Sequence, residues 1–193
     1  VFSNPGCWLN AWCFDVGGLH PASIIAMDKF GEYTKIYKEI RDARIFIKHH
    51  DYESAGKLLG GILKKYLTSE DDADNLSRAL KLILNSTYGF CSATFDNPFR
   101  DPRDLDNIVA KRGALFMITL KESVKKLGYN VLHCKTDSIK IENPDEFISN
   151  YIFEFGKKYG YEFEIENKFE RLCLINRAVY IGKLAKDDAS WLL

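Results

Sequence analysis

A helical middle region, residues 33–92, most constrains how this chain can fold, because it separates an early strand from all the later ones. Its first part, 33–50, repeats isoleucines between basic residues, which is typical of one long helix. A second helix is expected over 53–67, loosened by two adjacent glycines. A third opens at the acidic run 70–74, whose carboxylates suit the positive end of a helix dipole. These segments predict an antiparallel helical hairpin.

Strand patterns occur on both sides of this region. Before it, residues 11–16 are apolar and contain one carboxylate, Asp15. After it, the sequence predicts a helix, a tight hairpin that carries Asp137 in a three-residue turn, a second helix and two strands. These later elements are expected over 104–127, 129–141, 144–159, 161–165 and 172–181. The order predicts an α+β domain with a helical insertion.

Composition limits the function classes without selecting one. Hydrophobic residues make up 46% of the 193 positions, enough for a buried core, which excludes a disordered chain. The formal net charge is zero, and a basic groove balanced by an acidic metal site would give the same sum. Five cysteines without metal-ligand spacing favour a reduced, intracellular protein. No apolar run approaches the roughly 20 residues of a membrane span, and the absence of an initial Met suggests a fragment.

One face of the third helix carries three groups that suit a nucleotide. Lys81, Asn85 and Tyr88 are spaced i, i+4, i+7. A cation, an amide and a hydroxylated ring, in that order, match a triphosphate, a base-pair edge and a base or sugar plane. Gly89 follows and would let a flat ligand approach the backbone closely. The alternative is an amphipathic helix whose polar side simply faces water.

Asp15 and Asp137 each lie at the end of a predicted strand. Carboxylate oxygens combined with substrate phosphates are the usual ligands of magnesium, and two such ions can clamp an in-line phosphoryl transfer. Each residue taken alone could equally be an ordinary turn aspartate. On the first long helix, Arg44 and Lys48 are spaced i, i+4 and suit phosphate oxygens, although a solvated helix face would look the same.

Three motifs occur in the order and at the spacing found in family B DNA polymerases. Residues 15–24, DVGGLHPASI, resemble motif A, usually DxxSLYPS. Residues 81–89 match motif B, KxxxNSxYG, without a departure. Residues 135–138, KTDS, resemble motif C, usually DTDS, and residues 176–180 are weakly similar to a later KKxY motif. Motifs A and C are most similar to those of phage-encoded members.

This resemblance implies a palm, an antiparallel sheet with helices, interrupted by an inserted helical-hairpin fingers subdomain. Residues 1–32 would form the first part of the palm, 33–92 the fingers, and 93–193 the second part with the motif C hairpin. Exonuclease and thumb domains would belong to the same full-length chain. The implied activity is template-directed addition of dNTPs to a primer 3′-hydroxyl of DNA, using two magnesium ions.

The resemblance also implies roles for individual residues. Asp15 and Asp137 would bind both magnesium ions, joined by the carbonyl of Val16, and Lys81 would be a catalytic cation. Gly89, Arg177 and Tyr180 would contact DNA. The incoming nucleotide would be bound by Gly17, Gly18, Leu19, His20, Arg44, Lys48, Lys81, Asn85 and Tyr88.

Three residues depart from the family pattern. Lys135 replaces the first aspartate of motif C, His20 replaces the motif A tyrosine that excludes ribose, and Ala178 replaces a lysine. The imidazole of His20 is still expected to exclude a 2′-hydroxyl; the alternative is that it only packs under the short helix begun by Pro21. The short connections leave little room for the insertions of protein-primed members, which favours a nucleic-acid primer.

Two other functions remain open at this point. One is a catalytically inactive, polymerase-like scaffold that binds DNA, although decay of that kind should remove Asp15, Asp137 or Lys81 first. The other is a template-independent nucleotidyltransferase. No membrane partner is expected, and the predicted location is cytoplasmic, in the bacterial cytoplasm for a phage-encoded protein.

Overall fold

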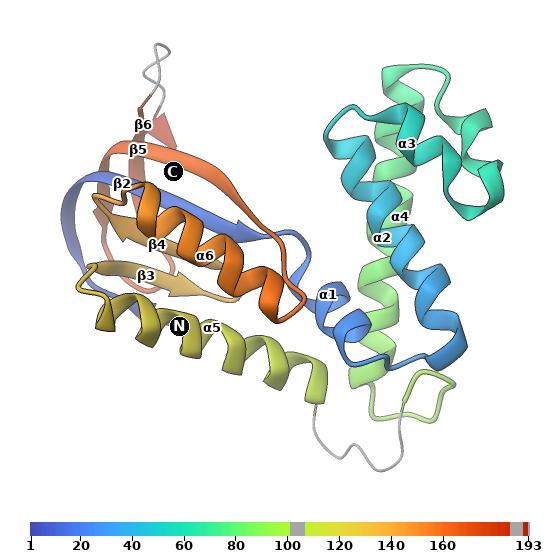
Figure 1. Ribbon diagram of the computed structural model, residues 1–193, viewed down its shortest axis with the longest axis horizontal. Helices are drawn as coiled ribbons and strands as arrows, with labels where there is room; N and C mark the ends of the chain where they lie inside the picture. Colours follow the sequence, from blue (N-terminus) through green and yellow to red (C-terminus); the bar gives the residue numbers. More distant parts are fainter. Residues whose placement is uncertain (101–106, 186–190, 193) are drawn as a thin grey trace. The chain divides into compact units, whose positions relative to one another are not determined.

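The computed structural model describes residues 1–100, 107–185 and 191–192, and the chain divides into two compact units. Unit 1 comprises Val1–Leu19 and Lys111–Leu193, and unit 2 comprises His20–Ala110. Strands dominate the first unit and helices the second (Figure 1). Helices inserted between strands of one sheet confirm the predicted α+β fold class. No helix in the described ranges is both long enough and apolar enough to cross a membrane.

Unit 1 is built on an antiparallel sheet with the strand order β1-β3-β4-β2-β5-β6-β7. The long strand β2 lies in its middle, between β4 and β5, so residues before the helical region are enclosed by strands that come after it. The strands are β1 (Phe2–Ser3), β2 (Gly6–Val16), β3 (Val131–Lys135), β4 (Ser138–Glu142), β5 (Phe163–Leu174), β6 (Tyr180–Leu184) and β7 (Trp191–Leu192).

Two helices, α5 (Ile108–Lys126) and α6 (Glu146–Lys158), complete the core of unit 1. Both place fully buried side chains inward, Leu120 and Val124 from α5 and Ile148 from α6. Phe153 of α6 meets Phe14 of β2 edge-on, with 6.1 Å between the ring centroids. Apolar burial of this extent is the main force that holds helices against a sheet.

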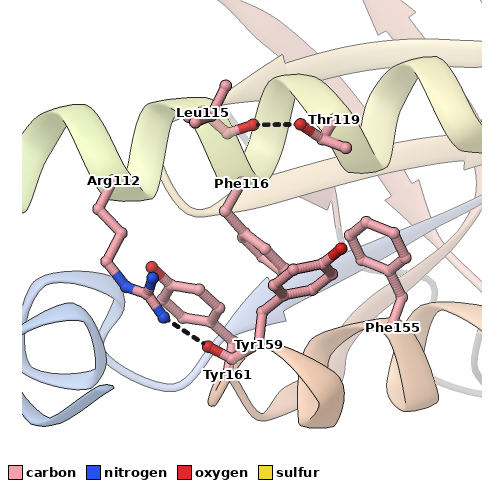
Figure 2. A pocket seen from close by; sticks show the side chains of 7 residues that line it. All are labelled: Arg112, Leu115, Phe116, Thr119, Phe155, Tyr159 and Tyr161. Atoms are coloured by element: carbon pink, nitrogen blue, oxygen red, sulfur yellow. Dashed lines mark hydrogen bonds between the residues drawn. The ribbon is translucent and has the colours of Figure 1, made fainter. Parts of the chain in front are cut away.

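Aromatic rings from α5, α6 and the residues that follow α6 line a pocket (Figure 2). Phe116 lies 4.1 Å from the Tyr161 ring, measured between centroids. Arg112 donates from Nη2 to the Tyr159 carbonyl over 2.8 Å, and its guanidinium carbon lies 5.5 Å from the Tyr161 ring centroid. A cavity of about 300 Å³ remains among the lining side chains. They are Arg112, Leu115, Phe116, Thr119, Phe155, Tyr159 and Tyr161.

Gly156 permits the close approach of α6 to the chain that follows it. A Cβ atom at this position would lie 2.8 Å from both the Tyr161 carbonyl oxygen and the Phe163 ring. We therefore expect Gly156→Ala to lower the free energy of unfolding by about 1–3 kcal/mol, because overpacking outweighs the better helix propensity of alanine. Urea unfolding followed by circular dichroism measures this change, and an unchanged or higher midpoint would contradict it.

Unit 2 is helical, and its two longest helices, α2 and α4, pack against each other in antiparallel directions (Figure 1). One apolar cluster includes Ala43, Leu80 and their neighbours, and a second includes Tyr37 and Leu84. The elements are α1 (Leu19–Ala26), η1 (Gly31–Tyr33), α2 (Thr34–Lys48), α3 (Tyr52–Lys57), η2 (Leu59–Tyr66) and α4 (Glu70–Ser92). The antiparallel helical hairpin predicted from the sequence is therefore present.

Sequence features explain where these helices begin. Ser69 caps α4, because its hydroxyl accepts a hydrogen bond from the Asp72 amide over 3.1 Å, and three acidic residues follow in the first turn. Asp51 caps α3 in the same way, accepting from the Ser54 amide over 3.1 Å.

Between α2 and α4, the Tyr37 hydroxyl donates to the Leu84 carbonyl over 3.3 Å, and burial raises the pKa of Tyr37.

Several predicted boundaries were wrong, each for a local reason. The helix expected over 53–67 ends at Lys57, because Leu58 is extended, with a ψ of 164°, and Leu59 adopts a positive φ of 51°. Gly60 and Gly61, with φ angles of 66° and 82°, interrupt the 3-10 helix η2 that follows. The two strands expected over 161–165 and 172–181 are instead one strand, β5, followed by a turn and β6. β5 pairs with β2 along its length despite polar residues in its middle, and pairing rather than alternation sets its extent.

Other differences concern where elements begin. The early strand extends back to Gly6, and the hairpin turn between β3 and β4 contains two residues rather than three. The helix expected from residue 104 is observed from Ile108, and positions 104–106 lie outside the described residues. The start of β2 is set by its pairing with β5, and the length of the hairpin turn is set by the pairing of β3 with β4. The sequence pattern of a single strand does not show how far such pairing extends.

Candidate functional site

The sheet brings Asp15 and Asp137 to neighbouring positions. Asp15 on β2 is paired with Ser138, the first residue of β4. Beside it, the Val16 amide donates to the Asp137 carbonyl over 3.0 Å. Both aspartates are half-buried. Thr136 adopts a left-handed φ of 48°, which closes the two-residue turn and places Asp137 next to the end of β2.

The donors gathered at these strand ends are oxygen atoms. Two carboxylates and the nearby Val16 carbonyl form a hard donor set, which suits magnesium better than softer metals. Within the described ranges, no group of three or more His, Cys, Asp or Glu side chains could hold a metal ion. Lys135, paired with Ser138, is exposed and supplies no carboxylate. Two carboxylates alone do not complete the coordination of a magnesium ion, which would need further oxygen ligands.

A third acid, Glu164 on β5, was not selected from the sequence. It is the direct cross-strand partner of Asp15 and, like it, half-buried. Residues 161–165 showed alternating acids, but nothing in that pattern indicates which residue they face. Direct partners in an antiparallel pair have Cβ atoms about 4.5–5.5 Å apart. Only the sheet register shows that Asp15 has an acid on one side and the motif C turn on the other.

Cys13 lies two residues before Asp15 and is not suited to bind a metal. It is fully buried, and its Sγ donates to the Glu166 carboxylate over 3.5 Å. Burial raises the pKa of the Cys13 thiol to about 12, so the group stays protonated at neutral pH. Metal ligation requires a thiolate.

Residues 17–19 leave β2 and lead into α1. The Gly17 amide donates to the Glu162 carbonyl over 2.9 Å. Gly18 adopts a left-handed φ of 74°, which a residue with a Cβ atom rarely does. Leu19 is buried, and its side chain lies against the space above Gly113, where a Cβ would be 2.9 Å away. A phosphate bound here would compete with the Glu162 carbonyl for the Gly17 amide.

In unit 2, the predicted face of α4 is accessible. Lys81 and Asn85 are exposed and Tyr88 is half-buried. Beside this face, the helix is anchored by buried Leu80 and Leu84. Leu82 and Ile83 do not help to bury this helix, because they are 67% and 47% exposed. Helical geometry turns positions 82 and 83 away from the stripe that contacts α2.

Three basic residues of α2, namely Arg41, Arg44 and Lys48, differ in how exposed they are. Lys48 is exposed and Arg44 is half-buried, while Arg41 is only 5% exposed. The Arg41 guanidinium lies 3.4 Å from the Asp42 carboxylate. Arg44 follows Ala43, which belongs to the same apolar cluster as Leu80, the residue before Lys81.

His20 and Tyr88, two predicted nucleotide-binding residues, are in direct contact within unit 2. Their rings are stacked, with 3.9 Å between centroids and an interplanar angle of 2°. The Tyr88 hydroxyl also accepts a hydrogen bond from Nδ2 of Asn107 over 3.0 Å. Sequence reasoning selected both rings but missed Asn107, which lies beyond the motifs and carries no distinctive spacing. The three residues form one contiguous group.

The turn between β5 and β6 carries Arg177, and Tyr180 begins β6. Oδ1 of Asn176 accepts from the Ala178 amide over 2.8 Å, and His133 Nε2 lies 3.3 Å from the Arg177 carbonyl. Burial lowers the pKa of His133, which favours the neutral ring. Arg177 itself is exposed. These contacts hold the turn and leave its cationic side chain accessible.

Two known proteins that are similar to this chain are DNA polymerases. No family model matches the chain. A curated relative, DNA polymerase 1 of Sulfolobus acidocaldarius, is 25% identical over 169 residues, which cover 85% of this chain and 18% of that protein. A solved structure, the family B DNA polymerase of the archaeon Pyrobaculum calidifontis, superposes with a TM-score of 0.66. The chain is similar in sequence to a DNA polymerase and in fold to a family B DNA polymerase.

The extent of the two matches differs. The structural match covers 99% of this chain and 28% of the Pyrobaculum protein, at 15% sequence identity, so it establishes the fold. The chain thus spans less than a fifth of the curated relative and little more than a quarter of the solved one. The resemblance to family B polymerases, first inferred from three motifs, is confirmed by a sequence match and a fold match that cover most of the chain.

Gly89 lies inside α4 and has open space around it. A Cβ built there would meet no atom within 4 Å. Glycine destabilises a helix interior relative to alanine, so we expect Gly89→Ala to raise the free energy of unfolding by about 0.5–1 kcal/mol. The urea midpoint measures this gain, and Gly156→Ala is a matched control with the opposite sign. A loss of stability would show that the folded chain itself requires this glycine.

Proposed function

We propose that these residues form the palm and fingers of a template-directed DNA polymerase that extends a primer 3′-hydroxyl with dNTPs. The observation that carries the proposal is the pairing of β2 with β4, which joins the acids of motifs A and C at adjacent strand ends. In this proposal, residues 1–32 and 93–193 are palm and residues 33–92 are fingers. Exonuclease and thumb domains would be further parts of the same polypeptide.

Asp15, Asp137 and the Val16 carbonyl would hold two magnesium ions. Bound there, the ions would supply Lewis-acid stabilisation of the attacking and leaving oxygens. The two carboxylates would fix the position of the primer end and the α-phosphate relative to the sheet. Because Asp15 lies in β2 and Asp137 lies in the two-residue turn that leads into β4, the pairing of these two strands limits how far apart the residues can move, and such rigidity favours an in-line geometry.

Residues of unit 2 would bind the incoming nucleotide. Lys81, Arg44 and Lys48 would neutralise its phosphates, with Gly17, Gly18 and Leu19 supplying backbone donors from the strand end. Asn85 would face the nascent base pair. Lys81 would act as a catalytic cation, because charge on the phosphate oxygens grows as pyrophosphate leaves. Its exposure on α4 supports this role, since an ion-paired buried lysine could not reach a ligand.

Contacts to DNA would come from Gly89, Arg177 and Tyr180. The open space around Gly89 shows no packing reason for glycine among the described residues, which supports close approach of a base pair to the helix. Arg177 is exposed in its turn and could meet a primer phosphate. The Tyr180 ring is supported edge-on by Phe169, 6.1 Å between centroids, and by the Lys140 ammonium 4.8 Å from its centre.

The proposal includes a nucleic-acid primer and a cytoplasmic location, in the bacterial cytoplasm for a phage-encoded protein. The second candidate is a catalytically inactive scaffold that binds DNA through the same surface. The survival of Asp15, Asp137 and Lys81 favours the active enzyme. Primer extension by the complete polypeptide distinguishes the two. Comparing templated with untemplated primers also tests for a template-independent transferase.

Asp15→Asn and Asp137→Asn should each reduce primer extension by the complete polypeptide by at least about 10³-fold. The amide keeps the shape of the side chain but removes the charge that a metal site requires, while single electrostatic groups in active sites are worth about 10²–10³ or more. Glu142→Gln on β4 is the matched control and should retain activity, since the Glu142 carboxylate accepts a hydrogen bond from Asn130, which an amide oxygen can also do. Near-normal kcat in either aspartate variant would overturn the metal assignment.

His20 would exclude the 2′-hydroxyl of a ribonucleotide. We expect His20→Ala to shift the dNTP-over-rNTP ratio of kcat/KM toward ribonucleotides by roughly 1–3 kcal/mol, because a ring that blocks one hydroxyl is removed. His20→Tyr should raise the ratio modestly, since the phenol is larger. Single-nucleotide incorporation kinetics measure all three ratios. An unchanged ratio in His20→Ala would place sugar selection elsewhere, with Tyr88 as the next candidate.

A further inference from the structure

We propose that Asn107 is a positioning residue for sugar selection, which it controls by holding the Tyr88 ring against His20. The inference rests on the proposed function in one respect, namely that His20 and Tyr88 meet the sugar of the incoming nucleotide. Asn107 lies outside the polymerase motifs, immediately before α5. All the contacts that carry the inference lie within unit 2.

Two contacts together fix the Tyr88 ring. Stacking on His20, at 3.9 Å and 2°, sets the plane of the ring but leaves it able to slide and rotate within that plane. The hydrogen bond from Asn107 Nδ2 to the Tyr88 hydroxyl, 3.0 Å long, fixes the far end of the ring. Sliding by a fraction of a ring width would open the space that a 2′-hydroxyl needs. The position of both rings therefore depends on a residue that touches neither ring face.

The orientation of the Asn107 amide follows from its second contact. Its Oδ1 accepts from the Ala110 amide over 3.0 Å, the bond of a helix N-cap. A backbone N–H requires an oxygen there, so the NH₂ group must face Tyr88. The Tyr88 oxygen consequently acts as the acceptor, and its own proton can be donated to a different acceptor. One side chain thus ties the start of α5 to the ring on α4.

Because Asn107 makes two separate contacts, a substitution can remove its hydrogen bond to Tyr88 and keep the N-cap of α5. Asn107→Ser keeps an N-cap hydroxyl, but its side chain is too short to reach Tyr88. Asn107→Asp keeps the cap and can still hold the tyrosine, because the carboxylate accepts the phenol proton and reverses the hydrogen bond. Tyr88→Phe removes the same contact from the other side.

The experiment measures the dNTP-over-rNTP ratio of kcat/KM in the complete polypeptide on a primer–template. We expect Asn107→Ser and Tyr88→Phe each to lower the ratio about fivefold, the loss of one hydrogen bond, mainly through a lower KM for rNTP. The double variant should match either single variant. Asn107→Asp should stay within about twofold of the wild type, and Asn107→Ser should unfold at nearly the wild-type temperature.

An unchanged ratio in Asn107→Ser would overturn the inference, and so would effects of Asn107→Ser and Tyr88→Phe that multiply. A lower ratio that accompanies a large loss of stability and is not rescued by aspartate would show a merely structural role, which also overturns it.

A measurement without catalysis separates this inference from the proposed function. Stacking on Tyr88 shifts the His20 ring protons upfield by ring current, and proton NMR detects that shift. Asn107→Ser should reduce it and Asn107→Asp should preserve it. If His20→Ala leaves sugar selection unchanged while the NMR shifts follow this pattern, the sugar role fails and the positioning contact stands. If the shifts do not respond to Asn107→Ser, the positioning contact itself is wrong.

Discussion

The pairing of β2 with β4 is the constraint on which the rest of this molecule depends. A strand from the first residues of the chain lies in the middle of a sheet made from the last part. The long helical region must therefore leave the sheet and return to it. Asp15 faces Ser138, and the Val16 amide meets the Asp137 carbonyl, so the ladder that completes the core also assembles the acidic site. Stability and the proposed chemistry share the same backbone hydrogen bonds.

In unit 2, the helix α4 has a buried apolar stripe beside an exposed polar one. Leu80 and Leu84 anchor α4 to α2, while Lys81 and Asn85 stay exposed. The helix is long, capped by Ser69 and rich in acids at its start, which makes it a firm support for side chains that must meet a ligand. Tyr88 is the exception, since it is half-buried and held by its neighbours rather than by the apolar cluster alone.

Features that depend on residues close together in the sequence were predicted correctly. Features that depend on contacts between distant segments were not. The helical hairpin, the α+β class and the family resemblance follow from periodicity and from motifs such as 81–89, which lie within single elements. The length of β5 and the position of Glu164 opposite Asp15 depend on register between strands distant in the chain. Asn107 could not be selected from the sequence either, because its partner Tyr88 lies on another helix, 19 residues earlier in the chain. The roles of the site residues remain predictions.

The central position of β2 also affects which changes of length this chain can tolerate. Side chains alternate between the two faces of a sheet, so one residue inserted or deleted within β2 or β4 would turn every later side chain of that strand to the opposite face. An insertion within β2 would then take Asp15 off the shared edge, and one within β4 would change which residues of β4 pair with β2, even though both aspartates were kept. Insertions between helices of unit 2 carry no such penalty. Divergent relatives should therefore vary in length between helices and keep the spacing within these two strands.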